Sequence, residues 1–373
     1  MKARICHLTS VHPRYDSRIF GKQCRSMVRA GFEVILIVAD GLGDESKDGV
    51  RIVDAGKPRG GRVGRFLRSS VAVCRRARNF KPDIYHFHDP ELIPFTLPIA
   101  VLGGRVIYDI HENLPEQTTR KHYLPTIVRK PLGWLLGFIE NSAVPMFAGA
   151  VTVIPEIARR FPAHKTIEVR NYPDLDEIQR GTKPFVEREA NVLYLGAISE
   201  TRGIREILMA SSADEERNFD LVLAGRWVPT TLREELSPVI EKSGVRDLGF
   251  LGRDEVNELL GSVRAGLVTL HPEGGYDVAL PVKLFEYMAA GLPVVVSDFP
   301  LWREIVERAG AGILVDPSDV DAIRLALNRI AGDPALAETM GRSGRAAVER
   351  DYSWGGQANR LADFYRRILG GKI

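Results

Sequence analysis

The chain has 373 residues, 45% of them hydrophobic and 27% charged, which is typical of a soluble globular protein and enough for two domains. No low-complexity tract, collagen-like period or repeat of 20–50 residues is found, so disordered, fibrous and solenoid classes are excluded. The formal net charge is only +3, but it is unevenly distributed: residues up to Arg170 include 27 Lys and Arg against 16 Asp and Glu, and the remainder has 24 against 32. A basic first half suits an anionic surface or substrate.

Cysteine content and hydropathy bear on the compartment. The three cysteines form no CxxC pair, which argues against a disulfide framework and a zinc ribbon. We expect three reduced thiols in or near a core, with a nucleophilic cysteine as the alternative. The N-terminal segment lacks signal-peptide features, and the most apolar stretch, residues 92–102, is about half as long as a bilayer-spanning helix. We therefore expect a cytoplasmic protein.

Strand and helix signals alternate along the chain. In the first half, strand-like runs occupy residues 3–9, 33–38, 83–87, 105–110 and 150–154, and a helix covers residues 20–30. The pattern restarts with strands at residues 191–195, 220–224, 263–270, 293–297 and 312–315 and a helix at 204–211. Continuous apolar strands separated by helices predict two parallel, doubly wound α/β sheets joined by a linker at residues 171–184. Ligands bind beyond the carboxyl ends of such strands, so a cleft between the domains is the default active site.

One segment carries most of the chemistry. Gly274 and Gly275 form an irregular loop that leads into a helix beginning near Pro281. Free backbone N–H groups and the helix N-terminus would suit a diphosphate. Lys283 and Glu286 share a helix face, where a carboxylate can accept both hydroxyls of a ribose; the alternative is an exposed ion pair.

This segment, Pro281-x-Lys283-x-x-Glu286-Tyr-Met-Ala-Ala-Gly-x-Pro293, resembles the donor-binding signature of glycosyltransferase family 4, whose members are retaining enzymes of the GT-B fold. The resemblance covers almost the whole chain. Its other motifs are Tyr194–Gly203, Asp316–Leu325, Tyr352–Trp354, His86–Pro90 and Tyr108–Asn113. It implies two Rossmann-like domains facing an interdomain cleft. Residues 1–172 would bind the acceptor, with helix 356–373 packing back on them, and residues 173–355 would bind the nucleotide-sugar donor.

The resemblance also assigns roles. Glu286 looks like the carboxylate that holds the ribose, Arg202 stands where the family usually has the lysine that clamps the diphosphate, and His111 looks like the histidine that reaches the transferring sugar. The implied catalytic residues are these three. The implied donor-binding residues add Gly196, Gly203, Gly275, Tyr276, Val278, Ala279, Leu280 and Lys283. The family's metal independence implies no cofactor and no metal, with arginine and the helix dipole stabilising the leaving group.

Two positions depart from the family pattern. Val278 stands where the signature has its first glutamate, and Ala197 stands where many members have an arginine. Glu273, Asp277 or the backbone N–H groups at residues 278–279 could substitute for the missing glutamate. The departures leave two alternatives open: a non-catalytic member that binds a nucleotide sugar or a partner transferase, and a nucleotide-sugar epimerase of the same architecture.

On the acceptor side the candidates are Asp16, Arg18, His88 and Glu112, which follow or end strands of the first domain. His86 and His88 alternate on one strand and are expected to lie partly in the core. A zinc site built from His86, His88 and His111 has no further support. Asp174-Leu-Asp176 imitates a metal-binding DxD motif, but a hinge or capping role in the linker is favoured.

Partner predictions rest on charge. Residues 57–81 contain Arg59, Arg62, Arg65, Arg68, Arg75, Arg76 and Arg78 with apolar residues between them. Such an amphipathic basic helix can lie on an anionic leaflet, and the alternative is a sheet-covering helix with a solvated face. Residues 132–138 are expected to be core, with a second membrane contact as the alternative. The acceptor is expected to be a glycan or a lipid-linked molecule in glycolipid, polysaccharide or cell-surface glycan synthesis, at the inner face of the membrane; no aromatic platform for nucleic acid is present.

Overall fold

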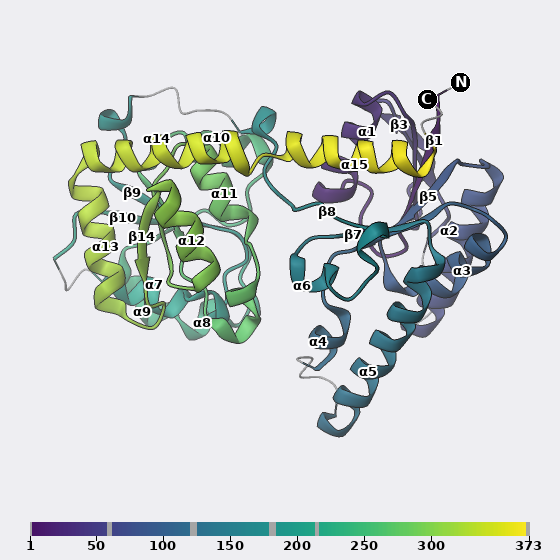
Figure 1. Cartoon of the computed structure of the whole chain (residues 1–373). Helices are drawn as coiled ribbons and strands as arrows, with labels where there is room; N and C mark the ends of the chain where they lie inside the picture. The colour runs from purple at the N-terminus through teal and green to yellow at the C-terminus, as the bar shows by residue number, and fades with distance from the viewer. Residues whose placement is uncertain (1, 58–61, 120–124, 179–183, 213–215, 371–373) are drawn as a thin grey trace. The chain divides into compact units, whose positions relative to one another are not determined.

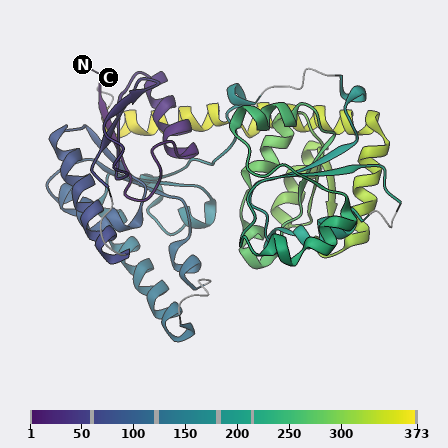
Figure 2. The ribbon, with the colours of Figure 1, turned by 180° about the vertical axis from the view of Figure 1, so that it is seen from behind.

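The computed structural model describes residues 2–57, 62–119, 125–178, 184–212 and 216–370. They form two compact units (Figure 1). Unit 1 is Met1–Asn171 with Trp354–Ile373, and unit 2 is Tyr172–Ser353. Each unit is a β-sheet with helices on both faces, seen from behind in Figure 2. The predicted pair of doubly wound α/β domains is confirmed.

The sheet of unit 1 has the strand order β3-β4-β2-β1-β5-β6-β7-β8, and only β3 runs antiparallel to its neighbour. The strands are β1 Arg4–Leu8, β2 Glu33–Val38, β3 Glu45–Lys47, β4 Val50–Asp54, β5 Ile84–Phe87, β6 Val106–Ile110, β7 Gly149–Thr152 and β8 Thr166–Glu168. The inner strands are buried almost throughout, as continuous apolar runs require in a sheet covered on both faces.

Helices and turns cover this sheet. They are η1 Ser17–Cys24, α1 Arg25–Arg29, α2 Arg62–Asn79, η2 Pro90–Leu92, α3 Ile93–Val101, α4 Leu114–Thr119, α5 Thr126–Ala143, η3 Val144–Met146, α6 Pro155–Ala158, η4 Ala163–Lys165 and the C-terminal α15 Trp354–Ile368. Helix α15 lies against α1 and η1, where Trp354 Nε1 donates to Ser26 Oγ at 2.8 Å (Figure 1). The last helix of the chain therefore belongs to the first unit.

Two features differ from expectation. The predicted helix at residues 20–30 is divided into a π-helix, η1, and a short α-helix, α1, because Asp16 O accepts from both Phe20 N and Gly21 N and widens the first turn. Residues 132–138 are not core: Trp134 is 72% exposed and Phe138 is 57% exposed. Here the smallest side chains of α5 face the protein.

The cysteines agree with the prediction of reduced core thiols. Cys6, Cys24 and Cys74 are all free and buried. Burial raises the pKa of the Cys74 thiol to about 12 and those of the other two thiols as well. A raised pKa keeps a thiol protonated, which argues against a nucleophilic role.

Unit 2 has an entirely parallel sheet with the order β11-β10-β9-β12-β13-β14. The strands are β9 Asn191–Leu195, β10 Asp220–Ala224, β11 Arg246–Asp247, β12 Ala265–Val268, β13 Val294–Ser297 and β14 Gly312–Val315. The helices are α7 Ile204–Ala210, α8 Leu232–Glu235, α9 Ser237–Ser243, α10 Arg253–Leu260, α11 Val282–Ala289, α12 Pro300–Ala309, α13 Val320–Gly332 and α14 Pro334–Asp351. The short turns are η5 Leu175–Glu177, η6 Phe185–Glu187, η7 Glu200–Arg202, η8 Pro272–Gly274 and η9 Tyr276–Val278.

Glycines allow the loops at the carboxyl ends of these strands to approach closely. A Cβ on Gly203, whose φ is +72°, would collide with the carbonyl oxygen of Thr269, and one on Gly225 would collide with that of Gly196. In the predicted linker, the Asp174 carboxylate caps η5 by accepting from Asp176 N at 3.2 Å. No helix in the described ranges has both the length and the apolar character to cross a bilayer.

Candidate active site

Strand register gathers polar residues on one face of the unit 1 sheet. His7 of β1 is in register with His86 of β5, and His86 pairs in turn with the β6 residue two positions before Asp109. Because side chains alternate along a strand, His88, Asp109 and His111 follow on that same face. The sequence analysis identified His86, His88 and His111 but missed His7 and Asp109. The signal that could have found them is the alternation of polar residues along each strand: His7 is two residues before Thr9, and Asp109 is two residues before His111.

These side chains form one hydrogen-bonded network. His7 Nδ1 lies 3.0 Å from His88 Nε2, and His88 Nδ1 lies 3.3 Å from His111 Nε2. Asp109 Oδ2 lies 3.4 Å from His88 Nδ1 and 3.3 Å from His111 Nε2. The His88 and Asp109 side chains are fully buried, whereas that of His111 is 21% exposed. His111 is therefore the solvent-facing end of a buried chain.

Helix α15 supplies the opposite end of the network. The hydroxyl of the buried Tyr365 hydrogen-bonds to His86 Nδ1 and lies 3.4 Å from His7 Nε2. A phenol between two imidazoles fixes which ring nitrogens carry protons. No sequence signal connected this tyrosine with the histidines, since 279 positions separate it from His86.

Arg18 and Gln23 of η1 hold the Asp109 carboxylate. Arg18 Nη2 donates to Oδ1 at 3.0 Å, and Gln23 Nε2 donates to Oδ2 at 2.5 Å. The two residues are five apart, so the wide turn of the π-helix brings both over the carboxylate. Burial alone would raise the pKa of Asp109, but the charge of Arg18 and the contacts with His111 and His88 hold it well below its usual range.

The buried histidines are neutral. Burial lowers the pKa of His7 and His86 well below the usual value, and that of His88 to about 3. Neutral imidazoles both donate and accept, so each ring can pass an orientation on to the next. The positive charge opposite Asp109 therefore comes from Arg18 at neutral pH.

His86, His88 and Asp109 are also close enough to share a metal ion, since their ligand atoms all lie within 4.8 Å of one another. His86 Nε2 has no hydrogen-bond partner among the described residues. A divalent cation would have to compete with Arg18, which already donates to Asp109. The donor set thus fits a structural ion pair better than a metal centre.

The other two acceptor-side candidates in unit 1 are Asp16 and Glu112, which lie outside the buried network. Asp16 caps η1 by accepting from the N–H groups of Arg18 and Ile19, and its carboxylate lies 3.5 Å from His12 Nδ1. Glu112 is exposed and accepts from Gln117. Of the four predicted acceptor-side residues, Arg18 and His88 are therefore buried, and Glu112 is the exposed one.

In unit 2, Lys283 and Arg202 lie near each other, and neither forms an ion pair with a carboxylate of the described residues. Lys283 Nζ is buried 3.8 Å from the centre of the Tyr194 ring and has no hydrogen-bond partner within the described ranges. Arg202 Nε donates to Tyr276 Oη at 3.3 Å. Burial, together with the charge of Arg202, lowers the pKa of Lys283 well below its usual value. A buried cation without a counterion, beside a second cation, is suited to bind an anion.

Glu286 lies one turn after Lys283 on α11 but has a different partner. Its Oε1 is 2.8 Å from Arg253 Nη1, and its side chain is 16% exposed. The alternative of an exposed Lys283–Glu286 ion pair is therefore wrong. Arg253, the first residue of α10, was missed because nothing in the sequence indicates that it meets α11.

The loop before α11 is held by a backbone hydrogen bond of its own and by a side chain of α12. Gly275 adopts a left-handed conformation with φ of +72°. The Ala279 carbonyl accepts from Trp302 Nε1 at 2.7 Å, and its N–H donates to the Tyr276 carbonyl at 3.1 Å. Val278 is 43% exposed. The remaining predicted residues are Leu280, partly buried against the unit 2 core, Gly196, with φ of +114°, and Gly203, which precedes α7.

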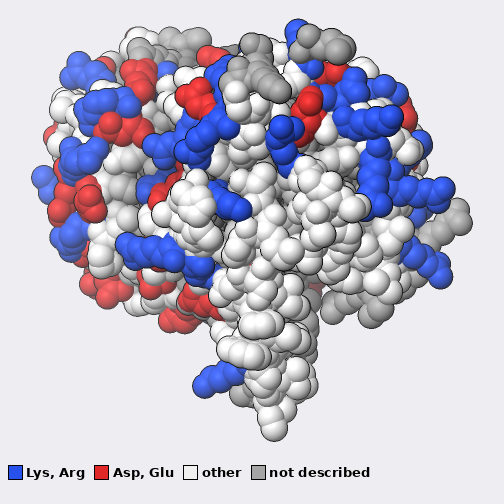
Figure 3. Space-filling view, turned by 45° about the vertical axis from the view of Figure 1, so that its right-hand side comes forward, with Lys and Arg blue, Asp and Glu red and all other residues white. Residues whose placement is uncertain are grey.

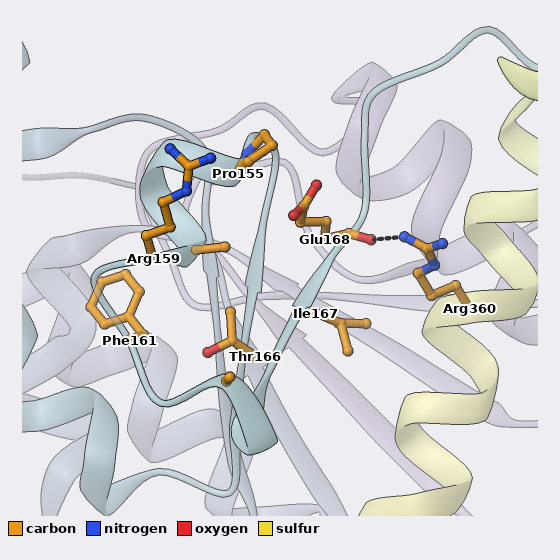
Figure 4. Close-up of a pocket in the computed structure, with 9 residues that line it drawn as sticks. Pro155, Arg159, Phe161, Thr166, Ile167, Glu168 and Arg360 are labelled. Atoms are coloured by element: carbon orange, nitrogen blue, oxygen red, sulfur yellow. Dashed lines mark hydrogen bonds between the residues drawn. The ribbon is translucent and has the colours of Figure 1, made fainter.

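A hollow of 740 Å³ lies elsewhere in unit 1, beside α6, β8 and α15 (Figure 4). Arg159 and Arg360 lie on either side of it, and Arg360 Nη1 donates to the Glu168 carbonyl at 3.2 Å. None of the predicted site residues lines it. Its position and lining give it no part in the histidine network.

Comparisons with known proteins identify related sequences and folds. The model "Glycosyl transferases group 1" matches residues 176–347, and "Glycosyltransferase Family 4" matches residues 18–171. The phosphatidyl-myo-inositol mannosyltransferase of Mycobacterium leprae is 24% identical over 364 residues, which are 93% of this chain and 91% of that protein. A GDP-mannose-dependent monoacylated alpha-(1-6)-phosphatidylinositol monomannoside mannosyltransferase of Corynebacterium glutamicum is 32% identical over 43% of this chain and 42% of its own.

Among solved structures, sucrose-phosphate synthase from Thermosynechococcus elongatus covers both chains fully at 17% identity with a TM-score of 0.77. Anabaena HepE in complex with UDP-glucose matches with a TM-score of 0.73 and 14% identity, over 98% of this chain and 99% of its own. At these identities the likeness is one of fold.

Proposed function

The chain belongs to glycosyltransferase family 4, and we propose that this GT-B glycosyltransferase moves a sugar from a nucleoside-diphosphate sugar to an acceptor hydroxyl, with retention of configuration and without a metal ion. The observation that carries the proposal is the buried, unpartnered side-chain nitrogen of Lys283 beside Arg202 in unit 2. A diphosphate supplies the negative charge that both cations lack among the described residues. Two such cations stabilise a departing diphosphate, as a metal ion does in other transferases.

Glu286 is proposed to bind the ribose of the donor. A carboxylate accepts hydrogen bonds from two neighbouring hydroxyls, and Arg253 holds it in place from α10. Residues 275–280 and the glycines at 196 and 203 line the proposed donor site, where the backbone can approach the ligand closely. No cofactor is included in the proposal.

In the proposed reaction, the bond between the anomeric carbon and the diphosphate oxygen breaks, and a bond to the acceptor oxygen forms on the same face of the sugar. The proton of the acceptor hydroxyl passes to the leaving diphosphate. His111 is proposed to contact the transferring sugar, since it is the exposed end of the histidine network. Asp16, Arg18, His88 and Glu112 stay the proposed acceptor-side residues, with the buried Arg18 and His88 acting through Asp109 and His111.

The acceptor is proposed to be lipid-linked or part of a cell-surface glycan. Two kinds of support exist: relatives whose names specify phosphatidylinositol acceptors, and the charge of unit 1, which has 31 Lys and Arg against 17 Asp and Glu. Exposed arginines at positions 68, 75, 76 and 78 of α2 would meet an anionic leaflet from the cytoplasmic side. Arg59 of the same basic segment, and the side chains of Arg62 and Arg65, lie outside what the structure describes.

Calorimetric titration with UDP, GDP, ADP, dTDP and CMP in excess EDTA tests the donor site. We expect one nucleoside diphosphate to bind, and Glu286→Gln to weaken it about tenfold, the effect of losing a charged hydrogen bond. The 2′,3′-dideoxy form of the same nucleotide is the matched control. The wild type should bind this form about as weakly as the variant binds the normal nucleotide. The variant should bind the two forms equally. Absence of binding, or binding only with a divalent metal, contradicts the proposal.

Turnover separates the proposal from its alternatives. GDP-mannose and UDP-glucose are the first donors to try, because such donors are named for a relative and for a bound structural neighbour. Sugar transfer to a lipid extract supports the transferase. Binding without transfer or hydrolysis would favour a non-catalytic member, which Val278 motivates, and conversion of the donor without acceptor would favour an epimerase.

A further inference from the structure

Helix α5 has its amphipathic pattern turned outward. Its large apolar side chains face solvent: Ile127 is 85% exposed, Trp134 72% and Phe138 57%, and Val128, Leu135 and Ile139 are also exposed. Figure 1 shows α5 extending away from the sheet of unit 1, and Figure 3 shows the projecting part as a mostly uncharged surface. A surface helix of a soluble protein normally buries such a stripe.

The orientation of α5 is fixed by its other side. Gly133 and Gly137 face α4. A Cβ added at Gly133 would lie 2.8 Å from the Pro115 carbonyl oxygen, and one added at Gly137 would lie 2.9 Å from Pro115 Cγ. At the base of the helix, the fully buried Glu140 accepts from Tyr108 Oη at 3.0 Å and from Arg160 Nη2 at 2.7 Å. The helix therefore cannot roll to bury its apolar stripe without breaking a buried ion pair and forcing two glycines into solvent.

The charge next to this apolar stripe indicates which kind of partner it fits. Helix α5 has no acidic residue before the buried Glu140, and it has two basic ones, Arg129 and Lys130, next to the apolar stripe. A second copy of unit 1 would bring an equally basic surface, whereas an anionic lipid surface is complementary. Trp134 and Phe138 stack with ring centres 5.7 Å apart, and aromatic residues are favoured at the level of lipid headgroups.

We propose that α5 inserts its exposed apolar face into the interfacial region of an anionic membrane, as an anchor that lies in one leaflet. The anchor deepens the proposed function by naming the surface through which unit 1 meets a lipid-linked acceptor. It differs from the electrostatic contact of α2 because buried apolar area, unlike charge attraction, survives high salt.

Trp134 provides the measurement. The other three tryptophans, Trp227, Trp302 and Trp354, are at most 9% exposed, so a solvent-exposed emission reports on α5. With vesicles of phosphatidylcholine and phosphatidylglycerol, we expect a blue shift, and we expect quenching by lipids brominated on the acyl chain that persists in 0.5 M salt, where the Debye length is only about 4 Å.

Variants test whether the apolar face drives binding. Ile127→Ser with Phe138→Ser keeps the reporter and should weaken vesicle partition by about tenfold or more. Leu102→Ser, which changes an 83% exposed leucine elsewhere in unit 1, should leave it unchanged. These exposed sites contribute little to folding, so all variants should keep the wild-type melting temperature.

Three results would overturn the proposal: no quenching of Trp134 by brominated lipid, equal partition of the double variant and wild type, or self-association of the wild type in sedimentation velocity that the double variant abolishes. The last would assign the face to a second copy. Nucleotide titration of the same variants keeps the two proposals apart, since donor binding by unit 2 should be unchanged whether or not α5 enters the membrane.

Discussion

At Lys283, the cost of burying an ammonium group is not offset by a counterion in the described part of the chain. The protein meets that cost by lowering the pKa of the group, to which the charge of Arg202 contributes. A diphosphate at this position would supply the missing counterion and raise the pKa of Lys283, because a nearby dianion favours the charged form of the lysine. Ligand binding and protonation of Lys283 are therefore coupled.

The coupling predicts a pH dependence with a definite sign. At pH values below the lowered pKa of the free protein, Lys283 is charged before and after binding. Above it, binding requires uptake of a proton, so the affinity for the nucleoside diphosphate in EDTA should fall as pH rises, by up to tenfold per pH unit. Titration calorimetry in buffers of different ionisation enthalpy measures the uptake directly.

Lys283→Met is the matched variant, since it keeps the length of the side chain without a titrating group. It should bind more weakly at low pH and show no proton uptake. Wild-type binding that takes up no proton at any pH up to about 10, the ordinary pKa of a lysine, would show that Lys283 does not contact the ligand.

Among the helices and strands, those with a long local sequence pattern were predicted, and features that depend on tertiary packing were not. The central strands are continuous apolar runs, and all of those in β1, β2, β5, β6 and β7 were predicted within a few residues. Strand β4 and the short edge strands β3, β8 and β11 were missed, and the edge strands have only two or three residues, which carry no readable pattern. The exposed face of α5 was misassigned, since periodicity shows that a helix is apolar but not which side the protein covers.

The candidate site divides in the same way. His111, Arg202 and Glu286 were predicted as site residues because each stands in a local motif. Asp109, Tyr365 and Arg253 are brought in by strand register, by the return of α15 and by the packing of α10 against α11, which are long-range features. Local sequence therefore indicates the groups that are proposed to react, and tertiary structure adds those that hold them.

Tyr365 of helix α15 allows a test of whether such residues position the site. Tyr365→Phe removes the hydroxyl between His86 and His7, so the tautomers of the buried imidazoles are no longer fixed and His111 loses its orientation through His88. We expect the rate of sugar transfer to fall about tenfold or more at saturating donor, while nucleotide affinity in unit 2 stays unchanged.

Trp354→Phe is the control for this change, because it removes another buried hydrogen bond of the same helix, to Ser26, away from the histidines. Both variants should lose about 1–3 kcal/mol of stability. If they lower the transfer rate equally, α15 acts only as a structural support and Tyr365 has no positioning role.

For the whole molecule, the two units differ in charge and in what they bury. Unit 1 has an excess of 14 positive charges and unit 2 an excess of 11 negative ones. Unit 1 also buries His7, His86 and His88 in neutral form, whereas unit 2 has one comparable buried base, Lys283, among the described groups. The units should therefore respond differently to acid.

Each buried histidine has a pKa of roughly 6.5 when unfolded and a lower one when folded. Their stabilising effect is present above about pH 6.5 and is lost as pH falls below it, because the unfolded chain then binds protons that the folded one excludes. As pH falls below about 6.5, each of the three histidines can remove up to about 1.4 kcal/mol per pH unit from the stability of unit 1, so the three together can remove up to three times what a single buried lysine can.

Calorimetric scans at a series of pH values test this difference. The transition that the bound nucleoside diphosphate raises belongs to unit 2, because a ligand stabilises only the unit that holds it. The other transition should move to lower temperature more steeply below pH 6.5, and His88→Asn should reduce that steepness by removing one of its three protons. If the nucleotide-sensitive transition is instead the acid-labile one, the buried histidines do not control the acid stability of unit 1.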